Sequence, residues 1–130
     1  MYNLNRDHQD NIIITNLYDI PYIYKLSQEI IFQKKFHFVE KLDAWNNRNI
    51  QNINHIKETL KELDCGLNCG IDQNGINELK LVKLNASHNK KIKNVNHMKE
   101  TLKELGCQCD CGIDQDGINQ LKLIKLDALL

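Results

Sequence analysis

Five cysteines are the residues of this 130-residue chain that most readily suggest chemistry. Three of them alternate at Cys107, Cys109 and Cys111, and Cys65 and Cys69 repeat the spacing of the outer pair. Thiolates grouped in this way could bind zinc, with each sulfur about 2.3 Å from the metal. The number of cysteines is odd and the first ten residues lack the apolar core of a secretory signal, so we expect reduced thiols in the cytoplasm.

Two acidic turns contain part of the pattern of a calcium-binding loop. Asp72 and Asp114 each stand three residues before a glycine. An EF-hand also needs an oxygen ligand two residues before the aspartate and a glutamate six residues after the glycine, and this chain has glycine and leucine at those places. We therefore expect ordinary turns here, and the sequence predicts no metal or other cofactor.

The sequence also offers little that points to catalysis. His55 and His97 stand 42 residues apart, without a nucleophile or acid at a recognised spacing, and neither a glycine-rich phosphate loop nor a Ser/His/Asp order occurs. Lys+Arg and Asp+Glu balance at 17 each, which gives no bulk attraction to nucleic acid. No apolar run of about 18 residues occurs, so no membrane span is expected. These features predict a protein that is not an enzyme.

The architecture that holds these residues follows from an internal repeat. Residues 57–63 recur identically as 99–105, and residues 69–73 recur as 111–115, in both cases 42 residues later. A finer period of 21 residues lies inside this one, with columns of leucine, isoleucine and asparagine, and two versions of the unit alternate. The copies are 39–59, 60–80, 81–101 and 102–122, followed by a partial copy at 123–130.

The unit Leu-x-x-Leu-x-(Ala/Cys)-x-x-Asn-x-x-Ile resembles the leucine-rich repeat, whose hallmark is L-x-x-L-x-L-x-x-N. Its residue sequence, such as Cys-Gly-Ile-Asp-Gln-Asn-Gly-Ile, is similar to that of mimivirus-like repeat proteins of giant amoeba-infecting viruses. This resemblance implies that the protein is located in the host cell cytoplasm. The resemblance covers 39–130 and implies an α/β solenoid. A curved parallel β-sheet would line the concave side, and short helical or 3-10 turns would line the convex side. Stacked copies would then bury one continuous core.

This architecture separates the candidate metal ligands. Neighbouring strands lie about 4.8 Å apart, so equivalent residues two copies apart, such as Cys65 and Cys107, are roughly 10 Å apart and cannot share a zinc ion. The same separation applies to His55 and His97. We therefore expect the cysteines to be packed thiols of the core, with Cys109 alone exposed at the end of a strand.

A buried asparagine ladder is expected where the chain turns inward after each strand. The amide of asparagine both donates and accepts, and can satisfy backbone groups that the turn leaves buried. The members of the ladder are Asn47, Asn68 and Asn89, with Asp110 in the fourth copy. An ionised aspartate cannot donate, so we expect the fourth copy to be locally weak.

The concave face of the sheet is the interaction surface that the resemblance implies, and the expected partner is a protein of unknown identity. Its central column alternates in sign, which suits either a self-neutralising ladder or a charged binding surface. Trp45 is either an interface anchor or is packed under the N-terminal segment. The predicted binding residues are Lys41, Asp43, Trp45, Glu62, Asp64, Lys83, Asn85, His88 and Glu104.

The two ends of the chain carry further expectations. Residues 1–38 fit no copy, and apolar residues after Pro21 predict an amphipathic helix over 20–34 that caps the first repeat. The alternative is an interaction motif, because 26–32 faintly resembles the F-box. Residues 123–130 predict a last strand with an open edge. Self-assembly into a homo-oligomer through this C-terminal edge is the alternative to a protein-binding role.

Overall fold

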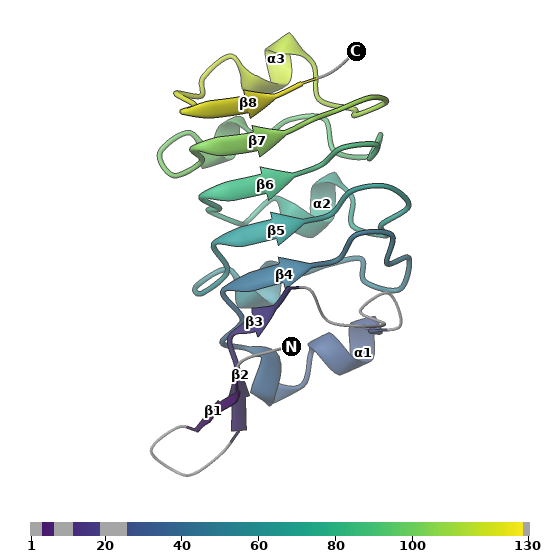
Figure 1. Ribbon diagram of the computed structural model, residues 1–130, viewed down its shortest axis with the longest axis vertical. Coiled ribbons are helices and arrows are strands. Elements are labelled where there is room, and N and C mark those ends of the chain that lie inside the picture. Colours follow the sequence, from purple (N-terminus) through teal and green to yellow (C-terminus); the bar gives the residue numbers. More distant parts are fainter. Residues whose placement is uncertain (1–3, 7–11, 19–25, 129–130) are drawn as a thin grey trace.

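The computed structural model describes residues 4–6, 12–18 and 26–128, and its main feature is one open sheet of six parallel strands in chain order (Figure 1). A small antiparallel sheet of β1 (Leu4–Arg6) and β2 (Ile12–Ile14) precedes it. The six parallel strands are β3 (Asn16–Leu17), β4 (Lys41–Asp43), β5 (Glu62–Asp64), β6 (Lys83–Asn85), β7 (Glu104–Gly106) and β8 (Lys125–Asp127).

The register from β4 to β8 follows the 21-residue period of the sequence. Leu42 lies opposite Leu63, and the same offset joins every later pair of strands. The middle leucines of β4 to β7 are at most 2% exposed, because they point into the core between the sheet and the returning segments. The prediction of a parallel sheet built from stacked repeats is confirmed.

Each segment that returns from one strand to the next contains a single helical turn, and two kinds alternate. The 3-10 turns η3 (Asn54–Ile56) and η4 (Asn96–Met98) are followed in chain order by the α-helical turns α2 (Gln73–Ile76) and α3 (Gln115–Ile118). All lie behind the strands in Figure 1. This confirms the prediction of short helical or 3-10 turns along one side of the sheet.

The turns that share part of the calcium-loop pattern are the starts of α2 and α3. The side chain of Asp72 accepts a hydrogen bond from Gly75 N at 3.0 Å, and Asp114 accepts one from Gly117 N at 2.9 Å, as N-cap residues do. A Cβ atom at Gly75 would lie 2.2 Å from the carbonyl oxygen of Gln51, so only glycine permits this approach to the preceding copy. The aspartates therefore act on the backbone of their own turns.

The N-terminal segment contributes a strand that the sequence analysis did not foresee. β3 pairs in parallel with β4, with Leu17 opposite Leu42, and Ile14 and Leu17 are both buried. The pattern Ile14-x-x-Leu17 matches Val39-x-x-Leu42, but the offset is 25 residues instead of 21. The longer offset concealed this first, irregular copy.

The described part of the helix expected over 20–34 contains less helix than predicted. Residues 19–25 lie outside the described residues, and the remainder holds one helical turn, α1 (Gln28–Ile31), and one 3-10 turn, η2 (Lys34–Phe36). Ser27 begins α1 by accepting a hydrogen bond from Ile30 N. Within the described ranges, no helix is long and apolar enough to cross a lipid bilayer.

Candidate functional site

The side of the sheet away from the helical turns is called here the open face, and it carries two columns of side chains. The first and third residues of each strand point to this face, because the middle leucines point to the core. The first column consists of Lys41, Glu62, Lys83, Glu104 and Lys125, and the third consists of Asp43, Asp64, Asn85, Gly106 and Asp127.

The first column is only partly self-neutralising. Lys41 Nζ lies 3.1 Å from a carboxylate oxygen of Glu62. No other ion pair occurs in this column, all of whose residues the structure describes, although Lys83, Glu104 and Lys125 are opposite one another in register. Lys83, Glu104 and Lys125 therefore present charges of both signs without an ion pair.

The third column has a structural role that the sequence analysis did not assign to it. Asp43 Oδ1 accepts a hydrogen bond from Trp45 N at 3.0 Å, and Asp64 Oδ1 accepts one from Gly66 N at 3.1 Å. Asn85 makes the same turn with the backbone two residues later. These are Asx turns, in which a side-chain oxygen holds the start of a loop, so this column shapes the loops after the strands.

The environment of Asp64 favours its protonated form. Burial is the main cause, and the nearby carboxylate of Asp43 adds to it, so that the pKa of Asp64 is raised to about 6. Tyr18, which directly follows β3, lies beside the same carboxylates, and burial together with Asp64 raises its pKa above the usual range. Tyr18 is a member of this surface that was missed with β3.

Gly106 interrupts the third column and leaves a depression of about 120 Å³ in the open face. Leu84 and Leu105 form part of its floor, and its polar rim contains both signs of charge. The rim residues are Lys83, Asn85, Glu104, Lys125 and Asp127. This depression brings together three of the predicted binding residues.

Trp45 is half-buried and lies along the loops that follow the strands. A Cβ atom at Gly66 would lie 2.3 Å from the indole ring, which shows that the ring occupies the space above this glycine. The rings of Trp45 and His88 meet edge to face, with their centroids 6.2 Å apart and an interplanar angle of 88°. Trp45 therefore packs toward the next copies. Gly66, which occupies the equivalent position 21 residues later, is the feature of the sequence that could have indicated this packing.

The asparagine ladder exists only in alternate copies. Asn47 and Asn89 are buried, and Asn89 Nδ2 donates to the carbonyl oxygens of Cys65 at 2.7 Å and Ile71 at 3.0 Å. Asn68 and Asp110 are exposed, so the prediction of a four-membered ladder is wrong at these two positions.

The reason is a shift of one residue in the turn. Asn47 N donates to Ala44 O, whereas in the next copy the corresponding hydrogen bond runs from Cys69 N to Gly66 O. Cys69 therefore takes the inward place, and its Sγ atom lies 3.5 Å from Ile71 N. The buried thiol accepts from the backbone N–H two residues later, as Asn89 Oδ1 accepts from Lys91 N in the other version of the repeat.

The cysteines divide into a buried pair and an oxidised pair. Cys65 and Cys69 are buried thiols, and burial raises the pKa of Cys65 and raises that of Cys69 to about 11. Cys107 and Cys111 form a disulfide bond, which corrects the expectation of reduced thiols throughout. Cys109 is an exposed thiol, as expected.

The two histidines join neighbouring copies. The Nε2 atoms of His55 and His97 lie 3.0 Å from the carbonyl oxygens of Ile31 and Ile76. A carbonyl can only accept, so Nε2 carries the proton in both rings. Burial lowers the pKa of both histidines, and both therefore favour the neutral ring.

A basic hollow lies beside the loops that carry Trp45 and His88. It has a volume of about 540 Å³ and contains the side chains of Arg48, Lys90 and Lys91 without a carboxylate in its lining. Lys90 reaches Asp110 at 3.5 Å, and the Lys91 ammonium group donates to the carbonyl oxygen of Cys69. Arg48 has no ion pair or hydrogen bond within the described part of the chain, so this hollow holds one uncompensated cation.

Comparison with protein-family models gives no match, and comparison with curated proteins gives none either.

Proposed function

We propose that this chain is a non-enzymatic protein-interaction module of the leucine-rich-repeat type that binds a partner protein through the open face of its sheet. The observation that carries this proposal is the unpaired charge around the depression at Gly106. No ion pair neutralises Lys83, Glu104 or Lys125 there, whereas the leucines between the charged positions, such as Leu84 and Leu105, are buried in the core. Polar groups that lack internal partners on a rigid sheet are suited to a complementary surface.

A protein is the best-matched class of partner. The rim of the depression alternates in sign, and the whole chain has equal numbers of acidic and basic residues. A polyanion would be repelled by Glu104 and Asp127, whereas a protein surface can present both signs in the complementary order. The 21-residue period with one strand and one helical turn per copy supports the leucine-rich-repeat type.

The same proposal assigns the N-terminal segment to a cap. Ile31 and Phe36 are buried in the same core as the repeats, at the end where β3 adjoins β4. A cap of this kind covers the first copy of a solenoid, whose core would otherwise meet solvent. From the resemblance of the repeat sequence to repeat proteins of giant viruses, we further propose that the module acts in the cytoplasm of a host cell.

A pair of charge reversals tests the open face. Lys83→Glu combined with Glu104→Lys keeps the net charge but inverts the two central charges of the rim, and it places like charges opposite each other at positions 62 and 83 and at positions 104 and 125. The matched control, Lys99→Glu with Glu100→Lys, makes the same exchange at exposed residues after η4. The tagged native chain and both variants are compared by pull-down and quantitative mass spectrometry.

We expect a partner that binds the native chain and the control equally and is lost, by about tenfold or more, from the open-face variant. Equal loss from both variants would contradict a role for the open face. Retention by both, with loss on Arg48→Glu, would move the binding site to the basic hollow.

Self-association through the C-terminal edge is a second candidate function, and one observation favours it. Leu126 is 48% exposed and Ile124 is 81% exposed, and within the described residues β8 pairs only with β7. An unpaired strand edge next to exposed apolar groups can pair with another chain. Light scattering over a range of concentrations would then show a mass that rises with concentration, and Leu126→Lys would restore the monomer. A mass that stays monomeric throughout would rule this function out.

A further inference from the structure

Two pairs of cysteines occupy equivalent positions in the repeat but differ in state. Cys65 and Cys69 stand 42 residues before Cys107 and Cys111, with identical spacing. The first pair consists of free thiols with no exposed surface, and the second pair is joined in a disulfide with a Cα–Cα distance of 5.3 Å. Equal sequence spacing therefore does not decide the state of each pair, and the surroundings of the two pairs differ.

The surroundings of the first pair exclude solvent. Asn89 donates its amide to Cys65 O, and the ammonium group of Lys91 donates to Cys69 O, so that the next copy lies over both residues. Burial also raises the pKa of both thiols, which leaves less of the reactive thiolate. These two cysteines are therefore closed to thiol reagents while the protein is folded.

The second pair is partly exposed and lines a surface cavity together with a third cysteine. Cys107, Cys109 and Cys111 line one cavity of about 290 Å³, together with apolar residues that include Ile113 and Leu126. Cys109 is exposed and has a positive φ of 52°, and its carbonyl oxygen accepts a hydrogen bond from Cys111 N. The volume is close to the lower limit of about 300 Å³ for small-molecule sites.

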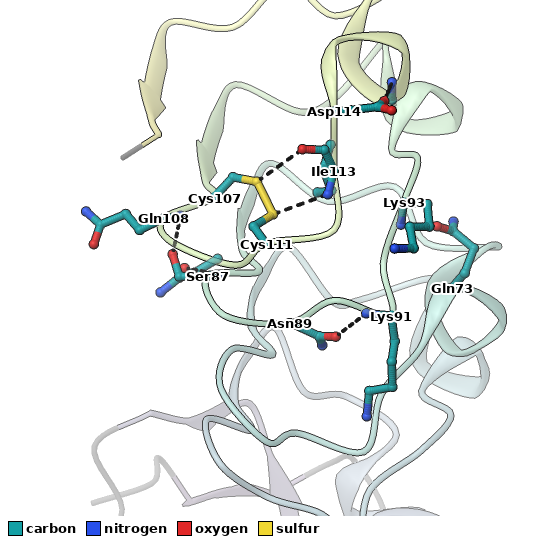
Figure 2. The surroundings of a disulfide bond; sticks show 12 residues. Gln73, Ser87, Asn89, Lys91, Lys93, Cys107, Gln108, Cys111, Ile113 and Asp114 are labelled. Atoms are coloured by element: carbon teal, nitrogen blue, oxygen red, sulfur yellow. Dashed lines mark hydrogen bonds between the residues drawn. A yellow bond between two sulfur atoms is a disulfide. The ribbon is translucent and has the colours of Figure 1, made fainter. Parts of the chain in front are cut away.

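The loop that carries these sulfurs is held by contacts other than the disulfide. Gln108 N donates to Ser87 Oγ at 2.9 Å, the Gln108 amide donates to Asp127 at 2.7 Å, and Cys107 N donates to Asp127 O at 2.8 Å (Figure 2 draws the first of these). Because Ser87 and Asp127, from the two neighbouring copies, hold the loop, we expect reduction to leave the three cysteines along the same cavity.

Both sulfurs of the disulfide meet the backbone of Ile113. Figure 2 shows Cys107 Sγ facing Ile113 O, at 3.8 Å, and Ile113 N facing Cys111 Sγ, at 3.5 Å. A disulfide sulfur carries no proton, so the first is a contact in the oxidised protein. In the reduced protein the Cys107 thiol can donate a hydrogen bond to this oxygen. The same loop conformation can therefore accommodate the reduced thiol.

We propose that residues 107–111 form a thiol–disulfide exchange site for low-molecular-weight thiols and disulfides of the glutathione class, with Cys109 as the thiol that reacts first. The thiolate of Cys109 attacks one sulfur of the small disulfide, which forms a mixed disulfide and releases one small thiol. Cys107 then attacks the Cys109 sulfur and releases the second small thiol. Cys111 attacks the Cys107 sulfur, which forms the observed disulfide and returns Cys109 to its thiol form.

The exchange is balanced and reversible. Two cysteine thiols are oxidised while one small disulfide is reduced to two thiols, and each thiolate that leaves takes up the proton that an attacking thiol released to water. An excess of the small thiol drives the same steps backward and opens the Cys107–Cys111 bond. The site requires no oxidant beyond the small disulfide itself.

The first test measures the state of each cysteine in the folded chain. The protein is equilibrated in buffers of glutathione and glutathione disulfide, alkylated without denaturant, then unfolded, reduced and alkylated with an isotopically distinct reagent. Peptide mass spectrometry should show Cys107 and Cys111 becoming protected together as the proportion of disulfide rises. Cys65 and Cys69 should receive only the second label at every ratio, and a control without the reduction step should show that they remain thiols. Protection of Cys107 and Cys111 at no ratio, or disulfide formation by Cys65 and Cys69 as well, would overturn the proposal.

The second test isolates Cys109. Reduced native chain, Cys109→Ser and the control Cys65→Ala are mixed with glutathione disulfide, and the Cys107–Cys111 bond is followed over time. Alanine is native at the position of Cys65 in the other version of the repeat, as Ala44 and Ala86 show. We expect Cys109→Ser to slow bond formation roughly tenfold, because the accessible thiol reacts first, and Cys65→Ala to leave the rate unchanged. Equal rates for Cys109→Ser and the native chain would remove Cys109 from the mechanism.

Discussion

The copies 60–80 and 102–122 share most of their residues, yet their equivalent isoleucines are fully buried only in the first copy. Ile71 and Ile76 have no exposed surface, whereas their counterparts Ile113 and Ile118 are partly exposed. The first copy has complete copies on both sides, and the second is followed only by β8 among the described residues. The comparison shows that burial in this protein belongs to the stack, since each copy supplies only one wall of the cavity that its side chains fill.

The largest expected difference concerns the core. Ile76→Ala should lower the free energy of unfolding by about 2–5 kcal/mol, because the deleted atoms leave a cavity between two rigid copies. Ile118→Ala should cost roughly half as much, because Ile118 already meets solvent on one side. Urea denaturation of both variants measures the difference. Equal costs would mean that position in the stack does not decide burial.

Reduction should affect one copy and spare the other. The Cys107–Cys111 bond closes a loop of five residues, for which chain entropy gives a stabilisation of about 2 kcal/mol. Hydrogen exchange with and without reductant should show faster exchange around Ile113 and no change around Ile71. Faster exchange in both copies would indicate that they unfold as one unit.

A difference between the copies at one column of the open face predicts a gain in stability. Asp64 in the first copy corresponds to Gly106 in the second, and only the first carries a carboxylate beside Asp43. Asp64→Asn should preserve the Asx turn, as Asn85 does, and stabilise the protein by about 1–2 kcal/mol at neutral pH. Partial solvent screening makes this less than the full value of about 1.4 kcal/mol per pKa unit.

The pH dependence of that gain has a definite sign. The pKa of Asp64 is raised from 3.8 to about 6 in the folded state, so the folded chain binds the proton more tightly than the unfolded chain. Ionised Asp64 therefore destabilises the folded state by an amount that grows as the pH rises from about 4 to 6 and is complete above 6. Denaturation at pH 4 and pH 7 should show the gain from Asp64→Asn only at the higher pH, and a gain of equal size at both would point to another cause.

The smallest expected effect concerns the histidines of the other two copies. Burial lowers the pKa of His97 below its ordinary value of 6.5, so the unfolded chain binds the proton more readily. The stability that the neutral ring contributes is present above pH 6.5 and is lost as the pH falls below it. His97→Gln, whose amide can still donate to Ile76 O, should make thermal stability less dependent on pH between 5 and 7. An unchanged slope would mean that His97 does not titrate in this range.

Sequence periodicity was sufficient for the regular part of the fold. Equivalent leucines 21 residues apart predicted the parallel register from β4 to β8, because a parallel sheet with a constant repeat places identical positions side by side. The open face followed from the same alternation of side chains along each strand. Three of its predicted binding residues, Lys83, Asn85 and Glu104, lie together at the depression.

The irregular parts depended on contacts that periodicity does not encode. β3 was missed because its copy is four residues longer, and the inward place of Cys69 was missed because the turn shifts by one residue without changing the length of the repeat. The packing of Trp45 toward the following copies was missed, because it depends on the empty space above Gly66. In each case the deciding partner belongs to a neighbouring copy.

What the sequence by itself determined is the repeat, its period, the strand in each copy and the residues that face the core. Only the tertiary structure decided which of two equivalent cysteine pairs is buried and which is bonded, and which charges of the open face are paired. The physical reason is that the sequence specifies the surface of each copy, whereas solvent exclusion and electrostatic pairing depend on what the adjoining copy places against that surface.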